Sequence, residues 1–131
     1  MIALDTNVLV RYVAQDDARQ SAAATRLIER SLSADARGFV SLVALLETVW
    51  VMESRYHADA QTVTGIVIDL LDTASIEVQD ATAVGKAIQR YAEGDVDLHD
   101  CLIVSLAADR KAEVETFDAK AAKRLGMKLL R

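Results

Sequence analysis

The sequence predicts an α/β fold in which helices cover a mainly parallel sheet. Short apolar runs that suit strands alternate along the 131 residues with longer segments of helical periodicity. No proline, low-complexity tract or internal repeat marks a linker, and the length suits one domain, residues 1–131. Alternating strands and helices build parallel sheets with helices packed on them.

The first half of the chain predicts two strands and three helices. "MIALD" is an apolar run with a polar end, and "TNVLVRYVAQ" suits a helix whose first turn is held by Asp5 or Thr6. A second helix covers "DDARQSAAATRLIERSL", with Asp16 or Asp17 as its N-cap. After Gly38, the strand "FVSLV" leads directly into the apolar helix "ALLETVWVMESRY".

The second half continues the same alternation. It predicts the helix "DAQTVTGIVIDLLD", the strand "IEVQ" and the helix "DATAVGKAIQRYAEG", which Gly94 closes. The helix "DLHDCLIVSLAADRKA", the strand "EVETF", the helix "DAKAAKRLG" and the strand "KLL" follow. In folds of this class ligands bind beyond the carboxyl ends of the strands, where loops and helix starts converge.

Composition narrows the class of protein. No apolar run reaches the roughly 20 residues that cross a bilayer, and the N-terminus lacks the features of a signal peptide, so we expect a cytoplasmic protein without membrane association. Cys101 is the only cysteine, which excludes an intramolecular disulfide, and with His57 and His99 it cannot form a closed zinc site. The net charge of −5 argues against a general nucleic-acid coat but leaves a metal-dependent nuclease open.

Four acids stand out because of the segments around them. Asp5 and Asp118 each follow a short apolar strand and open a helix. Asp100 lies in the first turn of a helix that starts near Asp97, and Glu47 interrupts an apolar helix, where a charge is costly without a partner. Each also has an ordinary interpretation, as an N-cap, as a charge that favours the helix dipole, or as a surface residue.

Taken together, the acids indicate a divalent metal site. If the strands before Asp5 and Asp118 are neighbours, both carboxylates enter one crevice, which Asp100 also reaches. Carboxylates a few ångströms apart repel by about 4 kcal/mol per pair at an effective dielectric constant of 20. A shared proton would relieve this repulsion, but nothing else suggests peptide chemistry. Mg²⁺ or Mn²⁺, which prefers oxygen ligands, fits better and would activate water for attack on a phosphodiester.

The chain resembles the PIN-domain family, because it carries four of that family's motifs in the same order. Within the family it resembles the VapC type of toxin. These motifs are "ALDTNVLVRYVAQDD", "LETVWVMESRY", "DLHDCLIVSLA" and "ETFDAKAAKRLGMKLL". The resemblance implies a three-layer α/β/α fold with a central, mainly parallel sheet, and an Mg²⁺- or Mn²⁺-dependent endoribonuclease that cuts RNA. It also implies the toxin of a type II toxin–antitoxin pair, a VapB-like antitoxin as partner, and a homodimer.

The resemblance also assigns roles to individual residues. By motif, the acids of the catalytic metal site are Asp5, Glu47, Asp100 and Asp118, with Asp97 as an extra acid that acts through water or as a cap. The supporting polar positions are Thr6, Asn7 and Thr116. Relatives often carry Phe and Ala where this chain has Leu98 and His99. His99 could donate a proton or contact phosphate, although neighbouring residues on a helix point in different directions.

Other residues have two interpretations each. Cys101 is expected to face the core, and Trp50 and Tyr56 to belong to the core or to an interface. The candidates for substrate contact, or else for solvated charges, are Arg11, Arg26, Arg90, Lys120, Lys123 and Arg124.

Two other functions compete with the nuclease. An aspartate-based phosphatase needs a second acid two residues after the first, where this chain has Asn7, and a receiver domain needs an acidic pair before Asp5. A catalytically silent PIN fold that only binds RNA or protein remains the second alternative. Such degenerate relatives lose one or more acids, whereas all four motif acids are present here, which favours activity.

Overall fold

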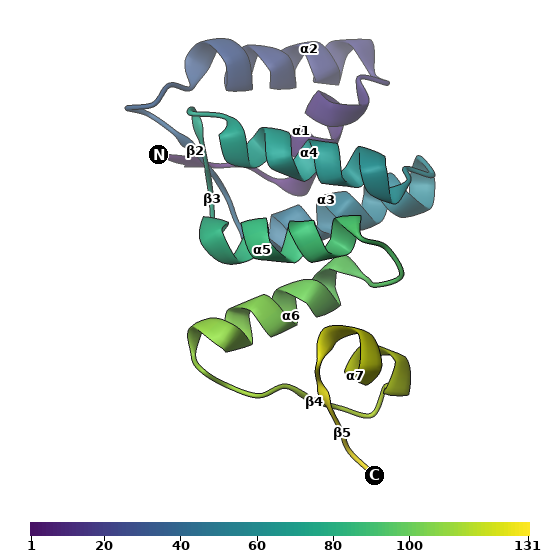
Figure 1. Cartoon of the computed structure of the whole chain (residues 1–131). Helices are drawn as coiled ribbons and strands as arrows, with labels where there is room; N and C mark the ends of the chain where they lie inside the picture. Colours follow the sequence, from purple (N-terminus) through teal and green to yellow (C-terminus); the bar gives the residue numbers. More distant parts are fainter. The chain divides into compact units, whose positions relative to one another are not determined.

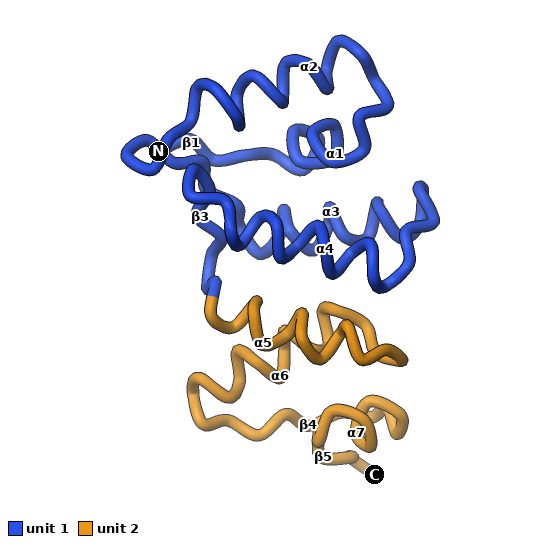
Figure 2. The backbone as a smooth tube through the Cα atoms, turned by 45° about the horizontal axis from the view of Figure 1, so that its top comes forward, with its two compact units in different colours: residues 1–81 blue, residues 82–131 orange.

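The computed structural model describes all 131 residues, arranged as two compact units (Figure 2). Unit 1 comprises Met1–Ala81 and unit 2 comprises Thr82–Arg131. No helix in either unit has both the length and the apolar character needed to span a membrane.

Unit 1 contains a three-stranded parallel sheet in the order β1-β2-β3. Figure 1 labels β2 and β3, and Figure 2 labels β1. Its strands are β1 (Ile2–Ala3), β2 (Gly38–Val40) and β3 (Ile76–Val78). Its helices are α1 (Thr6–Ala14), α2 (Ala18–Arg26), the π-helix η1 (Leu27–Ser31), α3 (Leu42–Arg55) and α4 (Ala60–Asp72). Ile2 lies opposite Gly38, and Gly38 lies opposite Ile76, so all three carboxyl ends lie at the same edge of the sheet.

Apolar residues at helical spacing hold unit 1 together. Leu45 and Val49 form the buried stripe of α3, and Val63 and Val67 form that of α4. At the helix starts, side-chain oxygens bind the backbone N–H groups that the first turn leaves unpaired. These pairs are Asp17 with Gln20 at 2.8 Å, Ser41 with Ala44 at 3.1 Å, and Asp59 with Thr62 at 2.8 Å.

A tyrosine–carboxylate bond links the loop after α1 to the end of α3. The Tyr56 hydroxyl donates to Asp16, which also accepts from Arg11 at 3.0 Å. The bond to Tyr56 is the main cause that lowers the pKa of Asp16, and it raises the pKa of Tyr56. A depressed carboxyl pKa contributes stability above the unfolded value of about 4, and this contribution is lost as the pH falls through the folded value.

Tyr56→Phe is therefore expected to reduce stability in a pH-dependent way. At pH 7 the melting temperature should fall by about 2 °C, a small effect because the bond is at the surface. The difference between the two proteins should shrink as the pH falls below the unfolded value of about 4 and through the lowered folded value, as Asp16 becomes protonated. Thermal melts at about pH 7 and at a series of lower pH values measure this, and a deficit that stays constant across the series would show that the bond does not stabilise the charged carboxylate.

Unit 2 consists of three helices and a two-stranded parallel sheet. Its elements are α5 (Ala81–Ala92), which begins at the boundary, α6 (Leu98–Asp109), β4 (Glu115–Thr116), α7 (Ala119–Leu125) and β5 (Lys128–Leu129). Glu115 lies opposite Lys128 in the sheet. The Ser105 hydroxyl of α6 donates to the Ala83 carbonyl of α5 at 2.7 Å. Cys101 is buried, as predicted.

The predicted α/β class with parallel strands is confirmed, and the elements occur in the predicted order. Hydrogen bonding produces two parallel sheets, however, where one was expected. The hydrogen-bonded neighbour of β1 is β2 and that of β4 is β5, so the condition that the strands before Asp5 and Asp118 are neighbours in one sheet is not met. Both strands are two residues long, which leaves few backbone groups for a further ladder.

Candidate metal centre and active site

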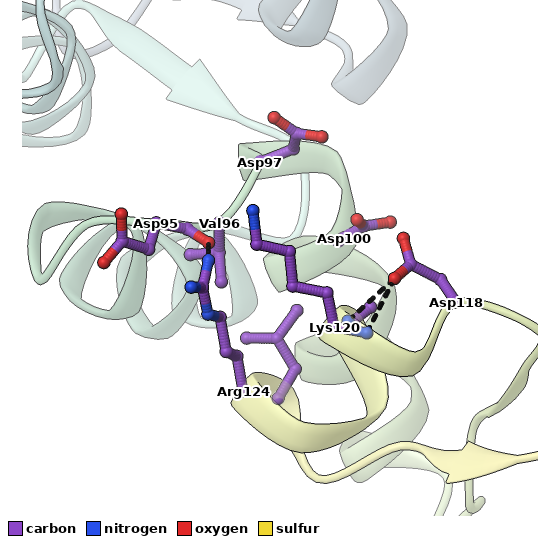
Figure 3. Close-up of a pocket in the computed structure, with 9 residues that line it drawn as sticks. Asp95, Val96, Asp97, Asp100, Asp118, Lys120 and Arg124 are labelled. Atoms are coloured by element: carbon purple, nitrogen blue, oxygen red, sulfur yellow. Dashed lines mark hydrogen bonds between the residues drawn. The ribbon is translucent and has the colours of Figure 1, made fainter.

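An acidic pocket of about 360 Å³ opens in unit 2 (Figure 3). It is formed by α6, by α7 and by the loop that precedes α6. The charged side chains that line it are Asp95, Asp97, Asp100, Asp118, Lys120 and Arg124. Carboxylates thus outnumber cations by two, which makes the pocket attractive to a positive ion.

Asp118 is fixed in this pocket by three hydrogen bonds. Its Oδ1 accepts from the backbone N–H groups of Lys120 at 2.9 Å and Ala121 at 3.0 Å, so the side chain is a true N-cap of α7. Its own backbone N–H donates to Thr116 Oγ1 at 3.0 Å. These bonds use one carboxylate oxygen and leave the other, Oδ2, without a protein donor.

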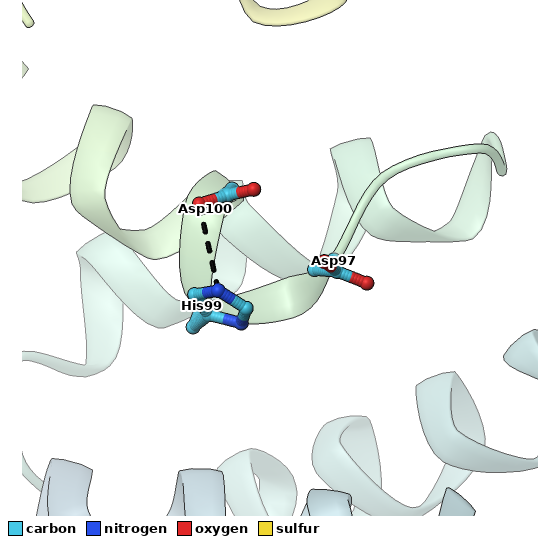
Figure 4. A group of neighbouring side chains, drawn as sticks. All are labelled: Asp97, His99 and Asp100. Carbon is cyan, nitrogen blue, oxygen red and sulfur yellow. Dashed lines mark ion pairs between the residues drawn. The ribbon is translucent and has the colours of Figure 1, made fainter. Parts of the chain in front are cut away.

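Asp97, His99 and Asp100 form a cluster at the start of α6 (Figure 4). One ligand atom from each lies within 4.8 Å of the others, and His99 Nε2 is 3.5 Å from Asp100 Oδ1. The expectation that adjacent residues diverge is not met, because the imidazole turns back toward its neighbour. Asp97 occupies the N-cap position but makes no capping bond with its side chain, so the capping role suggested for it is wrong.

The predicted site residues of unit 1 lie at the start of α1 and along α3. Asp5 is the N-cap residue of α1, but only its backbone carbonyl bonds the helix, and its side chain makes no capping bond. Thr6, Asn7 and Glu47 line a second pocket of about 320 Å³. Glu47 is on the exposed side of α3, so its charge needs no buried partner, contrary to the expectation from its apolar neighbours.

The geometry and the sequence can now be compared with known proteins. The sequence matches the PIN domain family over residues 2–126, which includes nearly all of both units. The chain belongs to the PIN domain family. PIN domains are commonly metal-dependent nucleases. The match agrees with the predicted three-layer α/β/α fold class, and no curated protein matches the chain.

The donor atoms of the PIN pocket suit the metals that the family uses. Mg²⁺ and Mn²⁺ prefer carboxylate oxygens and water, and the pocket offers Asp100, Asp97 and the free oxygen of Asp118. His99 adds an imidazole nitrogen beside Asp100, which Mn²⁺ accepts more readily than Mg²⁺. Within unit 2, the structure thus gathers two of the four predicted acids, and within unit 1 it places Glu47 beside Thr6 and Asn7.

Asp95 is a pocket acid of this PIN domain that sequence analysis did not single out. It follows Gly94 in a turn where φ is positive at both residues, 66° at Asp95 and 95° at Gly94. Such a pair is typical of an ordinary surface loop. Its backbone carbonyl accepts from Arg124 Nη1 at 2.7 Å, and Gly94 accepts from Arg90 Nη1 at 3.2 Å. The two arginines therefore hold the loop that forms one wall of the pocket.

Thr116→Val tests whether the hydroxyl positions Asp118. Valine keeps the shape of threonine but cannot accept the hydrogen bond from the Asp118 N–H. Groups that orient a metal ligand usually contribute a factor of about 10 to 100. If Asp118 is such a ligand, metal-dependent cleavage should fall about tenfold. Thr116→Ser keeps the acceptor and should retain most activity. Equal rates for the serine and valine variants would mean that the hydroxyl does not position Asp118.

Proposed function

We propose that this PIN domain is an Mg²⁺- or Mn²⁺-dependent endoribonuclease with Asp5, Glu47, Asp100 and Asp118 as its catalytic metal site. The observation that carries the proposal is the unit 2 pocket, in which Asp100 and Asp118 lie together with Asp97. Asp5 and Glu47 are added because they occupy the corresponding family motifs. The family match runs through both units, which supports the proposal that the whole chain is one domain.

Different residues of the chain have different roles in the proposed hydrolysis. Asp118 offers a fixed oxygen because its other oxygen is bonded to α7, and Thr116 holds the backbone at that position. Asp5 and Glu47 supply carboxylates with no capping duty or buried counter-charge. A bound Mg²⁺ or Mn²⁺ supplies Lewis-acid chemistry, lowering the pKa of water and offsetting charge that develops on the phosphate.

The test is cleavage of a mixed tRNA and ribosomal RNA pool by the purified protein with Mn²⁺, Mg²⁺ or EDTA. Asp100→Asn is the inactive comparison, and Asp109→Asn is its matched control because Asp109 is an exposed acid at the other end of the same helix. We expect discrete, metal-dependent fragments from the wild type and from Asp109→Asn alone. Equal cleavage by all three proteins would indicate a contaminating nuclease or a wrong site, and no cleavage by any would favour a silent binding module or a narrower RNA target.

We further propose that the protein is a cytoplasmic VapC-type toxin that forms a homodimer and is inhibited by a VapB-like antitoxin. The supporting observation is on α3, where Val43 and Trp50 are 77% and 61% exposed. Trp50 is therefore not a core residue, and its interface interpretation remains. An equimolar VapB-like protein should suppress cleavage, and light scattering should give the mass of two chains. Full activity beside the antitoxin would exclude that partner.

A further inference from the structure

Six basic residues are candidates for substrate contact. They differ in whether the charged group already has a hydrogen-bond or ion-pair partner in the structure. Arg11 pairs with Asp16 at 3.0 Å and donates to Gln20 at 2.7 Å. Arg90 and Arg124 are occupied by the backbone carbonyls of the loop before α6. Arg26 and Lys123 are exposed and lie outside the acidic pocket. Only Lys120 both lines that pocket and keeps its charged group free.

We propose that Lys120 binds an RNA phosphate at the acidic pocket and so positions the substrate for cleavage. This inference rests on the proposed nuclease function and assigns one of its substrate contacts. Lys120 is exposed on α7, two residues after Asp118. Figure 3 shows its side chain extending from α7 into the pocket, toward the loop that carries Val96.

The ammonium group of Lys120 forms no ion pair with the carboxylates of the pocket. Four aspartates line the same pocket, yet none lies within 4.0 Å of Lys120 Nζ, and the group makes no side-chain hydrogen bond. The backbone of Lys120 is tied to the acid site, because its N–H donates to Asp118 Oδ1 at 2.9 Å. The flexible side chain therefore starts beside Asp118 and extends into the same pocket.

Charge explains why such a cation is needed. RNA carries a negative charge at every phosphate, and the pocket holds two more carboxylates than cations. These acids repel the substrate, and Lys120 and Arg124 are the two positive groups of the pocket that oppose this repulsion. Arg124 is held at the pocket wall by the backbone carbonyl of Asp95, whereas the Lys120 ammonium group makes no bond and can move to a phosphate. A lysine suits this task because its ammonium is a mobile point charge that follows a phosphate without demanding a fixed bidentate geometry.

The experiment compares Lys120→Gln with Lys123→Gln, which removes the same charge from the same helix outside the pocket. Binding of a fluorescein-labelled single-stranded oligoribonucleotide is followed by anisotropy in EDTA at several salt concentrations. Kinetic constants are measured with Mn²⁺, and direct titration gives the Mn²⁺ affinity. Lys120→Arg serves as the conservative variant, and circular dichroism checks folding, which an exposed side chain should not disturb.

Lys120→Gln should weaken RNA binding about tenfold and raise KM by a similar factor with a smaller change in kcat. The slope of log affinity against log salt should fall by about 0.7, the value for one phosphate contact on a single strand. Lys120→Arg should restore most of the binding. Lys123→Gln should change these quantities much less.

Three results would overturn the assignment. If the wild type cleaves RNA but Lys120→Gln and Lys123→Gln behave alike, Lys120 is not a phosphate contact and the nuclease function stands. If Lys120→Gln binds Mn²⁺ more tightly with unchanged RNA affinity, Lys120 is instead a counter-charge for the acids. If the wild type neither cleaves nor binds RNA, both the proposed function and this contact are wrong.

Discussion

Asp118→Asn is expected to lower metal-dependent RNA cleavage by about 10³-fold and to leave the protein almost as stable as the wild type. Asparagine keeps an oxygen that can accept from the Lys120 and Ala121 N–H groups, and it is as good an N-cap as aspartate. It loses the negative charge that holds the ion in the proposed metal site, and such an ion contributes several kcal/mol of transition-state stabilisation. One substitution thus separates the helix-capping role of this carboxylate from its proposed role in metal binding.

Asp118→Ala provides the comparison because it removes both duties. It should lose the same activity and, in addition, about 1 kcal/mol of stability through the lost cap. Chemical denaturation and initial cleavage rates of the three proteins measure the two effects. If Asp118→Asn retained activity, Asp118 would be a structural cap and nothing more.

Asp5→Ala should also lower cleavage by about 10³-fold, with a change in stability of less than about 0.5 kcal/mol. Asp5 occupies the N-cap position of α1 yet forms no side-chain capping bond. The bonds at this helix start use its backbone carbonyl, which accepts from Val8 at 3.0 Å and Leu9 at 3.3 Å, and alanine retains that carbonyl. The carboxylate therefore contributes little to folding.

Asp17→Ala is the matched control within unit 1, because the Asp17 side chain does cap its helix, accepting from Gln20 at 2.8 Å. Its substitution should cost about 1 kcal/mol of stability and leave the activity per folded molecule unchanged. The two variants are thus expected to show opposite effects. A loss of stability without a loss of activity in Asp5→Ala would contradict the assignment of Asp5 to the metal site.

The order and approximate limits of the elements followed from the sequence because apolar periodicity and cap residues are local signals. The start of α3 is an example. Ser41 caps it, so "FVSLV" ends as a strand at Val40 and Leu42 already belongs to the helix. The pairing of strands could not be obtained in this way, because β1 and β4 contain two residues each and carry no register information.

The positions of the candidate site residues along the chain were predictable from the sequence, whereas the conformation and exposure of their side chains were not. The motif placed Asp100 and Asp118 correctly at helix starts, and both line one pocket. Whether a carboxylate caps its helix depends on side-chain torsions that sequence does not specify, so Asp97 and Asp118 looked alike and differ in the structure. The exposure of Glu47 depends on which face of α3 is covered, which the apolar residues on both sides of it concealed.

The buried thiol of Cys101 makes the start of α6 observable in the native protein. Cys101 is 3% exposed, follows Asp100 directly, and its pKa is raised mainly by burial. Thiol reagents attack the thiolate, so a reagent in solution must wait for α6 to open locally. Since there is no second cysteine, the labelling rate relative to that of the unfolded chain measures one opening equilibrium. That equilibrium describes how often the helix that carries Asp100 leaves its native packing.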